Sequence, residues 1–340
     1  MRRAPRNEGA PVSDGLLDTH RPADSPSPAL AGPGLAAAVR RAFLATRPPF
    51  LIASASPVAV GTAWAGAAFH RFDGLMFGLA LAIMLLAHAA ANVYNDVGDD
   101  ITGADPGNDG RIYPYTGGSR FIQSGLLSRA QMTRLAAGLA AAALLLGALL
   151  AVLRGPGVIW LGCAGLALGL LYSLPGVQLS ARGLGEATVA IGFGALPVLG
   201  SVWLQTGFVD LGAALLCVPV SAWAAAILII NEVPDIDADR RAQKRTLVVR
   251  WGVRGARWIY RGLVVIALGA SAAAIAERVL PLWYALPAVA FAAIGLHSAR
   301  GISANGTKRP QLKRSIELTL AIHALGCITL ITAILLNHNG

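Results

Sequence analysis

Charged residues are scarce in this chain of 340 residues, and that scarcity excludes most soluble folds. Asp, Glu, Lys and Arg together make up 14% of the sequence, whereas an ordinary soluble domain contains about 25%. Hydrophobic residues reach 55% and the mean hydropathy is +0.59. The composition therefore predicts a polytopic membrane protein.

Cysteine is also rare, and no nucleic-acid motif is present. Cys163, Cys217 and Cys327 lie in apolar runs without metal-ligand spacing, so we interpret them as packing residues. The net charge of +10 is compatible with nucleic-acid binding. Without a supporting motif, the cations fit anionic lipid headgroups and a phosphate-bearing substrate better. We expect the lipid bilayer as a partner and no nucleic acid; protein partners are unknown.

Long apolar runs dominate the rest of the chain. Each is long enough to cross about 30 Å of hydrocarbon as a helix, since a helix rises about 1.5 Å per residue. The expected fold is all-α, with nine transmembrane helices. The runs lie near 48–69, 75–97, 131–153, 158–174, 184–206, 211–233, 259–277, 280–299 and 317–336.

Residues 1–38 differ from the rest of the chain. They are rich in Pro, Ala, Gly, Ser and Asp and show no apolar periodicity, which predicts a disordered tail. They lack the short apolar stretch and cleavage site of a secretory signal, so the first apolar run is expected to be retained. We therefore divide the chain into a tail, 1–38, and a membrane domain, 39–340.

The distribution of cations predicts the orientation. With the N-terminus inside, all 28 Lys and Arg residues except Arg71, Arg154 and Arg278 fall on one side of the membrane. Lys and Arg are retained on the cytoplasmic side. We expect a protein of the cell (inner) membrane with a cytoplasmic N-terminus and cytoplasmic active-site loops, and with its C-terminus outside.

An acidic signature occurs twice, each time where an apolar run meets a polar loop. NVYNDVGDD at 92–100 and NEVPDIDAD at 231–239 both read Asn, three residues, Asp, three residues, Asp. At about 100° per residue, this spacing keeps three side chains on one helix face. The candidate catalytic residues are Asn92, Asp96, Asp100, Asn231, Asp235 and Asp239.

The two signatures predict a metal site. A single copy also fits a solvated helix end, but two copies at matching helix ends favour a shared function. Four carboxylates at a membrane boundary repel one another unless a cation lies between them. Mg²⁺ binds through a few carboxylates together with substrate phosphate oxygens. We assign Asp96 and Asp100 to one metal site and Asp235 and Asp239 to the other.

Other polar residues complete the candidate site. Asn92 and Asn231, one turn deeper, are expected to orient a carboxylate or contact a diphosphate. Asp99, Asp105 and Asp109 fit ordinary turn composition. Candidates to hold phosphate oxygens are Arg47, Arg120, Lys244 and Arg245.

With these motifs in place, the chain resembles the UbiA superfamily of intramembrane prenyltransferases. Paired Asp-rich motifs on helices 2 and 6 of a nine-helix bundle are its signature. Three further stretches resemble the 1,4-dihydroxy-2-naphthoate polyprenyltransferases of the menaquinone branch. They are TGGSRFIQSGLLS at 116–128, LYSLPGVQLSARGLGE at 171–186 and DADRRAQKRTLVVRWG at 237–252. The resemblance implies Mg²⁺-assisted transfer of a polyprenyl group from its diphosphate to an aromatic quinone precursor.

Two departures from the family pattern concern the substrate-binding residues. Many relatives carry a Tyr followed four positions later by Lys; here Tyr172 is followed by Gly176. Arg182 is a candidate to supply the missing cation. Tyr172 also fits an interfacial anchor. Arg120 stands where the naphthoate branch is expected to have a small residue.

Several alternatives stay open. A UbiA-type enzyme can use another acceptor, such as 4-hydroxybenzoate or homogentisate. An intramembrane terpene cyclase would need the same metal site, because ionisation precedes either trapping or cyclisation of the cation. A cation-coupled transporter is the non-enzymatic reading, although its acidic residues usually lie near the bilayer midplane.

Overall fold

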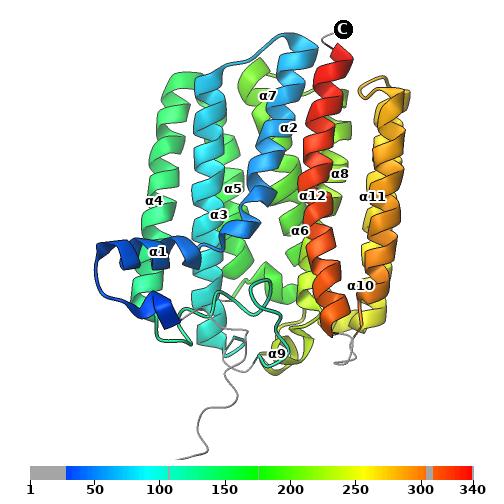
Figure 1. The fold of residues 1–340 in the computed structure, drawn as a ribbon. Coiled ribbons are helices and arrows are strands. Elements are labelled where there is room, and N and C mark those ends of the chain that lie inside the picture. The colour runs from blue at the N-terminus through cyan, green and yellow to red at the C-terminus, as the bar shows by residue number, and fades with distance from the viewer. Residues whose placement is uncertain (1–27, 106–107, 175, 304–308, 339–340) are drawn as a thin grey trace, which may run out of the picture.

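Helices make up every regular element of the computed structural model, which describes residues 28–105, 108–174, 176–303 and 309–338. Figure 1 shows most of the long helices standing side by side as one bundle. In chain order they are α2 (Ile52–Phe69), α3 (Gly74–Thr102), α4 (Arg129–Arg154), α5 (Gly157–Ser173), α7 (Leu196–Thr206), α8 (Leu211–Glu232), α10 (Leu247–Ala276), α11 (Ala285–Ser298) and α12 (Arg309–His338). The predicted all-α membrane fold is confirmed.

Short elements connect these helices. The short α6 and a π-helical turn run directly into α7 and make one span with it, Gly185–Thr206. The short elements are α1 (Leu35–Ala45), η2 (Pro48–Phe50), η3 (Leu179–Arg182), α6 (Gly185–Ala190), η4 (Ile191–Ala195), α9 (Ile236–Arg241), η5 (Leu282–Tyr284) and η6 (Ala299–Gly301), with η1 (Pro28–Ala31) before them.

The predicted count of nine membrane helices is not confirmed. Among the described residues, eight helices are long and apolar enough to cross a membrane. The segment predicted at 158–174 forms α5, an apolar helix of 17 residues that is shorter than the other spans.

Polar caps set where several spans begin. Asp73 accepts hydrogen bonds from the backbone N–H groups of Leu75 (2.9 Å) and Met76 (3.1 Å) at the start of α3. Ser128 and Gln131 form a capping box at the start of α4. Asp210 caps α8 and also accepts a hydrogen bond from the Trp64 indole at 2.9 Å. Such caps satisfy backbone donors that helix geometry leaves without partners.

The centre of the bundle is built around α2 and α8. In the most apolar 18 residues of each span, 67% are buried inside the protein in α2 and 72% in α8, but only 17% in α4. Val60 and Trp64 of α2 pack in one core with Val198 of α7 and Leu216 of α8. By contrast, α4 leaves most of its apolar surface for lipid.

The polar loops that carry the signatures lie at one end of the bundle. The connection after α3, the short α9 and the start of α10 gather there, while α12 ends at the opposite end (Figure 1). The expected disordered tail, 1–38, is wrong for its last part, because η1 and α1 are helical from Pro28 and Leu35 onward. Residues 1–27 lie outside the described residues.

Candidate active site

The first signature lies on a continuous helix, as predicted. α3 runs through Thr102 and therefore contains Asn92, Asp96 and Asp100. Asp96 is 2% exposed; it forms an ion pair with Arg47 and accepts a hydrogen bond from the Ser119 N–H at 2.9 Å. Asn92 donates its amide to the Thr46 carbonyl at 2.9 Å. This face of α3 therefore holds the chain segment that leads into α2.

Asp100 and Asp99 point to different neighbours. Asp100 forms an ion pair with Arg129 at 2.6 Å and accepts a hydrogen bond from Gln123 at 3.1 Å, which directs it toward the start of α4. Asp99 is buried and pairs with Lys244. Sequence reasoning gave Asp99 little weight, although its spacing of three from Asp96 also places it near that helix face.

The second signature does not lie on one helix, which corrects the prediction. α8 ends at Glu232, a turn follows, and α9 begins at Ile236. Pro234 explains the break, because proline has no N–H to donate to the preceding turn. Asn231 thus lies on α8, Asp235 in the turn and Asp239 on α9. The Asn231 Oδ1 atom is buried without a hydrogen-bond partner.

Asp235 is held by the loop that follows α3. Its carboxylate accepts hydrogen bonds from the Asn108 amide at 2.7 Å and from the Gly117 N–H at 3.2 Å. Burial raises the pKa of Asp235, and these hydrogen bonds only partly oppose that shift. Burial likewise raises the pKa of Asp239 to about 7. Burial therefore disfavours the ionised form of both carboxyls unless a cation lies close to them.

Lys244 bridges the two signatures. It is 8% exposed, pairs with Asp99 of α3, and places its Nζ atom 3.7 Å from Asp239 of α9. Burial lowers its pKa, but Asp99 and Asp239 outweigh burial, so the pKa of Lys244 is raised. Lys244 was predicted to hold phosphate oxygens, and here it joins carboxylates that lie 140 residues apart in the sequence.

Arg47 has the same role beside Asp96. Its backbone is left-handed (φ 56°), and its guanidinium contacts Asp96. Burial lowers its pKa, but the carboxylates of Asp96, Asp105 and Asp99 outweigh burial and raise it. Arg47 and Lys244 therefore both neutralise carboxylates of the cluster.

A glycine pair lets the loop after α3 close over the cluster. Gly117 (φ 70°) and Gly118 (φ 76°) have left-handed backbones, and a Cβ atom on Gly118 would overlap the carboxylate of Asp105. Asp105 is 4% exposed, and burial together with Asp99 and Asp96 raises its pKa to about 8. The Arg120 guanidinium donates to the Asp105 carbonyl, so this predicted phosphate ligand lies at the cluster.

Arg182 and Arg245 lie apart from the carboxylates. Together with Arg250 and Gln243 they line an open cavity of about 460 Å³. Arg182 donates to the Gly176 carbonyl within its own loop. Among the described residues the cavity lining contains no Asp or Glu. The structure therefore gives Arg182 no contact that would replace the lysine expected after Tyr172.

Tyr172 lies near a pair of glutamates that sequence reasoning missed. It is half-buried at the end of α5 and interacts electrostatically with Glu232 and Lys244. Glu232, at the end of α8, interacts with Glu186 at the start of α6, and both are buried. Their only sequence signal was a charged residue at the edge of an apolar run. The pair offers carboxyl oxygens next to the metal-site candidates.

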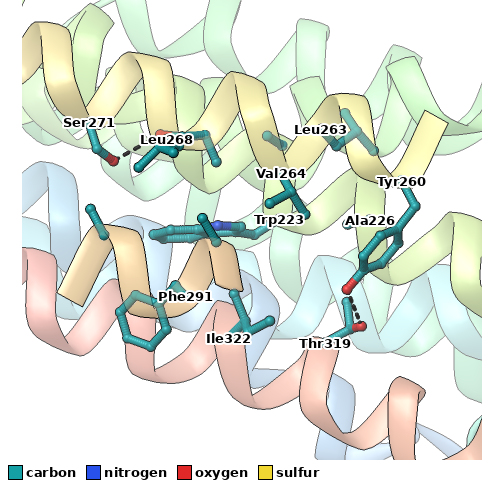
Figure 2. Close-up of a pocket in the computed structure, with 14 residues that line it drawn as sticks. Trp223, Ala226, Tyr260, Leu263, Val264, Leu268, Ser271, Phe291, Thr319 and Ile322 are labelled. Atoms are coloured by element: carbon teal, nitrogen blue, oxygen red, sulfur yellow. Dashed lines mark hydrogen bonds between the residues drawn. The ribbon is translucent and has the colours of Figure 1, made fainter. Parts of the chain in front are cut away.

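A cavity elsewhere in the bundle is a packing gap. Figure 2 shows it between the side chains of Trp223, Tyr260 and Phe291, with the Tyr260 hydroxyl bonded to Thr319 at 2.7 Å. Its volume of about 20 Å³ is on the scale of one water molecule. It cannot hold a prenyl chain, so no substrate role follows from it.

The residues at the cluster fit Mg²⁺ by their chemistry. Hard oxygen donors from the buried Asp96, Asp99 and Asp239 and the half-buried Asp235 lie at one end of the bundle, and Asn231 adds a buried amide oxygen without a hydrogen-bond partner. Within the described residues, no three such groups converge closely enough to hold an ion by themselves. Because Arg47 and Lys244 hold the carboxylates, a cation has to displace these pairs.

Comparison with known proteins adds independent information. The profile described as the UbiA prenyltransferase family matches residues 54–325. The 1,4-dihydroxy-2-naphthoate octaprenyltransferase of Mycobacterium tuberculosis is 34% identical over 222 residues, which cover 65% of this chain and 73% of that protein. The Escherichia coli protein of that name is 32% identical over 237 residues, covering 65% and 72%.

Solved structures match the fold. A UbiA homologue from Archaeoglobus fulgidus bound to GPP and Mg²⁺ aligns with a TM-score of 0.61 at 14% identity, covering 85% of this chain and 99% of that chain. The apo structure of a UbiA homologue from Aeropyrum pernix aligns with a TM-score of 0.60 at 21% identity, covering 83% and 96%. At these identities the likeness concerns the fold.

Proposed function

The chain belongs to the UbiA prenyltransferase family, and we propose that it transfers a polyprenyl group from an allylic diphosphate to an aromatic quinone precursor, 1,4-dihydroxy-2-naphthoate. The enzyme class follows from the family and from relatives that are prenyltransferases. The proposed acceptor is the one named for several of the curated relatives.

One observation supports the proposal most directly. Lys244 bridges Asp99 on α3 and Asp239 on α9, so carboxylates from both signatures face one buried space at a single end of the bundle. A midplane ion pathway through broken helices, as in many transporters, is a different arrangement. The present one suits a polyphosphate that enters from a loop-covered end while its tail lies among apolar helices.

We propose that Asp96, Asp99, Asp235 and Asp239 hold Mg²⁺, with Asn231 near them and Asp100 as a further candidate. When bound, Mg²⁺ neutralises the diphosphate and makes it a better leaving group. Arg47 and Lys244 could hold phosphate oxygens if a metal took their place on the carboxylates, and Arg120 is a further candidate for this role. Asn92 keeps Arg47 in place through the Thr46 carbonyl.

The remaining residues act on the organic partners. The bond between the prenyl C1 atom and the diphosphate oxygen breaks, a ring carbon bonds to C1, and the ring loses a proton or its carboxylate as CO₂. Tyr172 and the glutamates Glu186 and Glu232 offer groups that can accept hydrogen bonds from ring hydroxyls. The apolar bundle excludes water from the reactive cation.

We further propose the cell membrane as the location, with the cluster and the N-terminus on the cytoplasmic side. The support is the asymmetric distribution of Lys and Arg. Residues 39–340 would form the enzyme domain.

An activity assay in liposomes tests the proposal. Polyprenyl diphosphates would be offered with dihydroxynaphthoate, 4-hydroxybenzoate, homogentisate or no acceptor, each with Mg²⁺ or with EDTA. We expect Mg²⁺-dependent prenylation of dihydroxynaphthoate. Transfer only to another ring would reassign the acceptor, and a hydrocarbon product without any acceptor would indicate a cyclase. No reaction with any donor would refute the proposal.

A matched pair of variants tests the site. Asp235→Asn keeps the side-chain volume but removes the carboxylate that accepts a hydrogen bond from Asn108. We expect turnover to fall by at least about 100-fold, the scale of removing one preorganised electrostatic group. Asp237→Asn lies in the same segment, is exposed and forms a surface ion pair with Arg240, so turnover should change less than about twofold. Equal losses in both variants would contradict the assignment.

A further inference from the structure

Helix α1 leaves an apolar stripe uncovered. Leu35, Val39 and Phe43 are 81%, 59% and 58% exposed. Their spacing of four residues places them on one side of the helix. A helix at the surface of a soluble domain turns such a stripe toward the core. In α1 the stripe points outward instead.

The other side of α1 is fixed to the protein. Ala45, the last residue of α1, is buried in a cluster with Leu30 of η1, Val93 of α3 and Met132 of α4. Arg41 donates one guanidinium nitrogen to the carbonyls of Leu30 and Gly32, each at 2.8 Å. The end of α1 is therefore held by the bundle, and Arg41 ties the middle of the helix to the segment before it, on the side away from the stripe.

The depth of α1 along the bundle matches the membrane boundary. Figure 1 shows α1 lying across α3 and α4, roughly perpendicular to both, near the end that carries the signature loops. Its cluster includes Met132 and Ala136 of α4, three and seven residues after the helix start at Arg129. At about 1.5 Å per residue, these contacts lie roughly 5 and 10 Å along α4.

The length of α4 places this level at the edge of the hydrocarbon. Its 26 residues span about 39 Å, so a core of about 30 Å leaves a few ångströms of helix at each end. Interfacial helices bury their apolar side about 5–10 Å into the boundary between headgroups and acyl chains. The stripe on α1 therefore lies where lipid, rather than water, meets the protein.

We propose that α1 is an interfacial helix whose Leu35, Val39 and Phe43 insert into the lipid boundary. The partner is the bilayer surface, and the exposed Arg40 beside the stripe suits anionic headgroups. The contact also reaches the candidate active site, because α1 leads directly into Thr46 and Arg47. Thr46 accepts a hydrogen bond from Asn92, and Arg47 pairs with Asp96. Lipid thus helps to place Arg47, a consequence that rests on the proposed function.

Spin labels test the lipid contact without any activity measurement. In a Cys163→Ser background, single cysteines at positions 35, 39 and 43 would carry nitroxides in liposomes. We expect greater accessibility to oxygen than to a water-soluble nickel chelate at all three positions, as at Leu145 on the exposed side of α4. Arg240→Cys in α9 gives the aqueous reference. Nickel-dominated accessibility, or protection from both reagents by a second copy or by residues 1–27, would overturn the proposal.

Kinetics test the link to Arg47. The triple variant Leu35→Gln, Val39→Gln, Phe43→Gln should raise the KM for the allylic diphosphate at least fivefold in liposomes, with a smaller effect on kcat. The conservative triple Leu35→Ile, Val39→Ile, Phe43→Leu should keep the normal KM. An unchanged KM in the Gln variant would overturn the link. If the unaltered protein transfers no prenyl group, the proposed function fails while the spin-label result still decides the lipid contact.

Discussion

Replacing Lys244 by methionine should destabilise the metal-free protein strongly. The substitution keeps an unbranched, flexible side chain but removes the charge between Asp99 and Asp239, the latter 3.7 Å away. At an effective dielectric constant of about 20, one such pair interacts by about 4–5 kcal/mol. Removing one partner of a buried pair costs about 3–5 kcal/mol, because the other charge stays buried and uncompensated.

The same reasoning predicts that Mg²⁺ restores part of the lost stability. Thermal unfolding of purified protein in detergent would be followed with and without Mg²⁺. At roughly 2 °C per kcal/mol, the Lys244→Met variant should melt about 6–10 °C lower without metal. With millimolar Mg²⁺ the deficit should shrink to about half or less, because a ligand that binds the folded state stabilises it.

A control isolates the effect of burial. Lys313 pairs with Glu317 at 3.9 Å on a half-exposed surface of α12, so Lys313→Met should cost only about 0–1 kcal/mol. The bridging role of this lysine would be refuted if the Lys244→Met protein were as stable as the unaltered one. It would also be refuted if Mg²⁺ did not reduce the loss in melting temperature.

Three further predictions concern the loops around the cluster. Gly118→Ala should lower turnover at least tenfold, because its Cβ atom would overlap the Asp105 carboxylate and Gly118 has a left-handed backbone that disfavours a side chain. Normal kinetics would show that the turn can relax. The raised pKa values of Asp239 (about 7) and Asp105 (about 8) mean that both carboxyls hold protons at pH 6. Calorimetry should therefore find that Mg²⁺ affinity rises between pH 6 and 8 and that binding releases protons. The metal-free protein should lose stability as pH rises from about 4 through 8, because carboxyls with a raised pKa favour the folded state only when protonated. A Mg²⁺ affinity that does not depend on pH would contradict this. Arg182→Gln and Arg245→Gln should each raise the KM for the diphosphate severalfold at low salt with little change in kcat, because they line an open basic cavity rather than the carboxylate cluster; a loss confined to kcat would contradict that placement.

The parts of the fold that sequence could predict are those governed by local rules. α3 was predictable because an apolar run leads into Asn92, Asp96 and Asp100 at helical spacing, and no residue in that stretch interrupts the helix. The same spacing gave a wrong prediction at the second signature, which does not lie on one helix because Pro234 ends the hydrogen-bond pattern of α8. The proline was visible in the sequence, so this error came from weighing period above backbone chemistry.

Other features depend on packing between distant segments. Asp100 was predicted to face the second signature, but Asp99 is the residue that pairs with Lys244. Which of the two faces the cluster depends on the rotation of α3 against α9 and α10, and residue spacing alone does not define that rotation. Arg182 was expected to approach the substrate, but the turn that contains it directs its guanidinium to the Gly176 carbonyl. The start of α1 was missed because residues 1–38 were predicted to be disordered from their composition. The four-residue spacing of Leu35, Val39 and Phe43 already indicated a helix.

The ion pairs within the cluster make the binding of metal and the binding of diphosphate depend on each other. Arg47 and Lys244 occupy the carboxylates that a divalent ion would need, so bare Mg²⁺ must displace them and leave two buried cations without partners. A diphosphate arriving alone would meet the same cations already engaged. If both arrived together, Arg47 and Lys244 could pair with phosphate oxygens and the carboxylates with the metal, so that every charge would keep a counter-ion. Magnesium alone is therefore expected to bind weakly, and the metal together with the diphosphate is expected to bind more tightly.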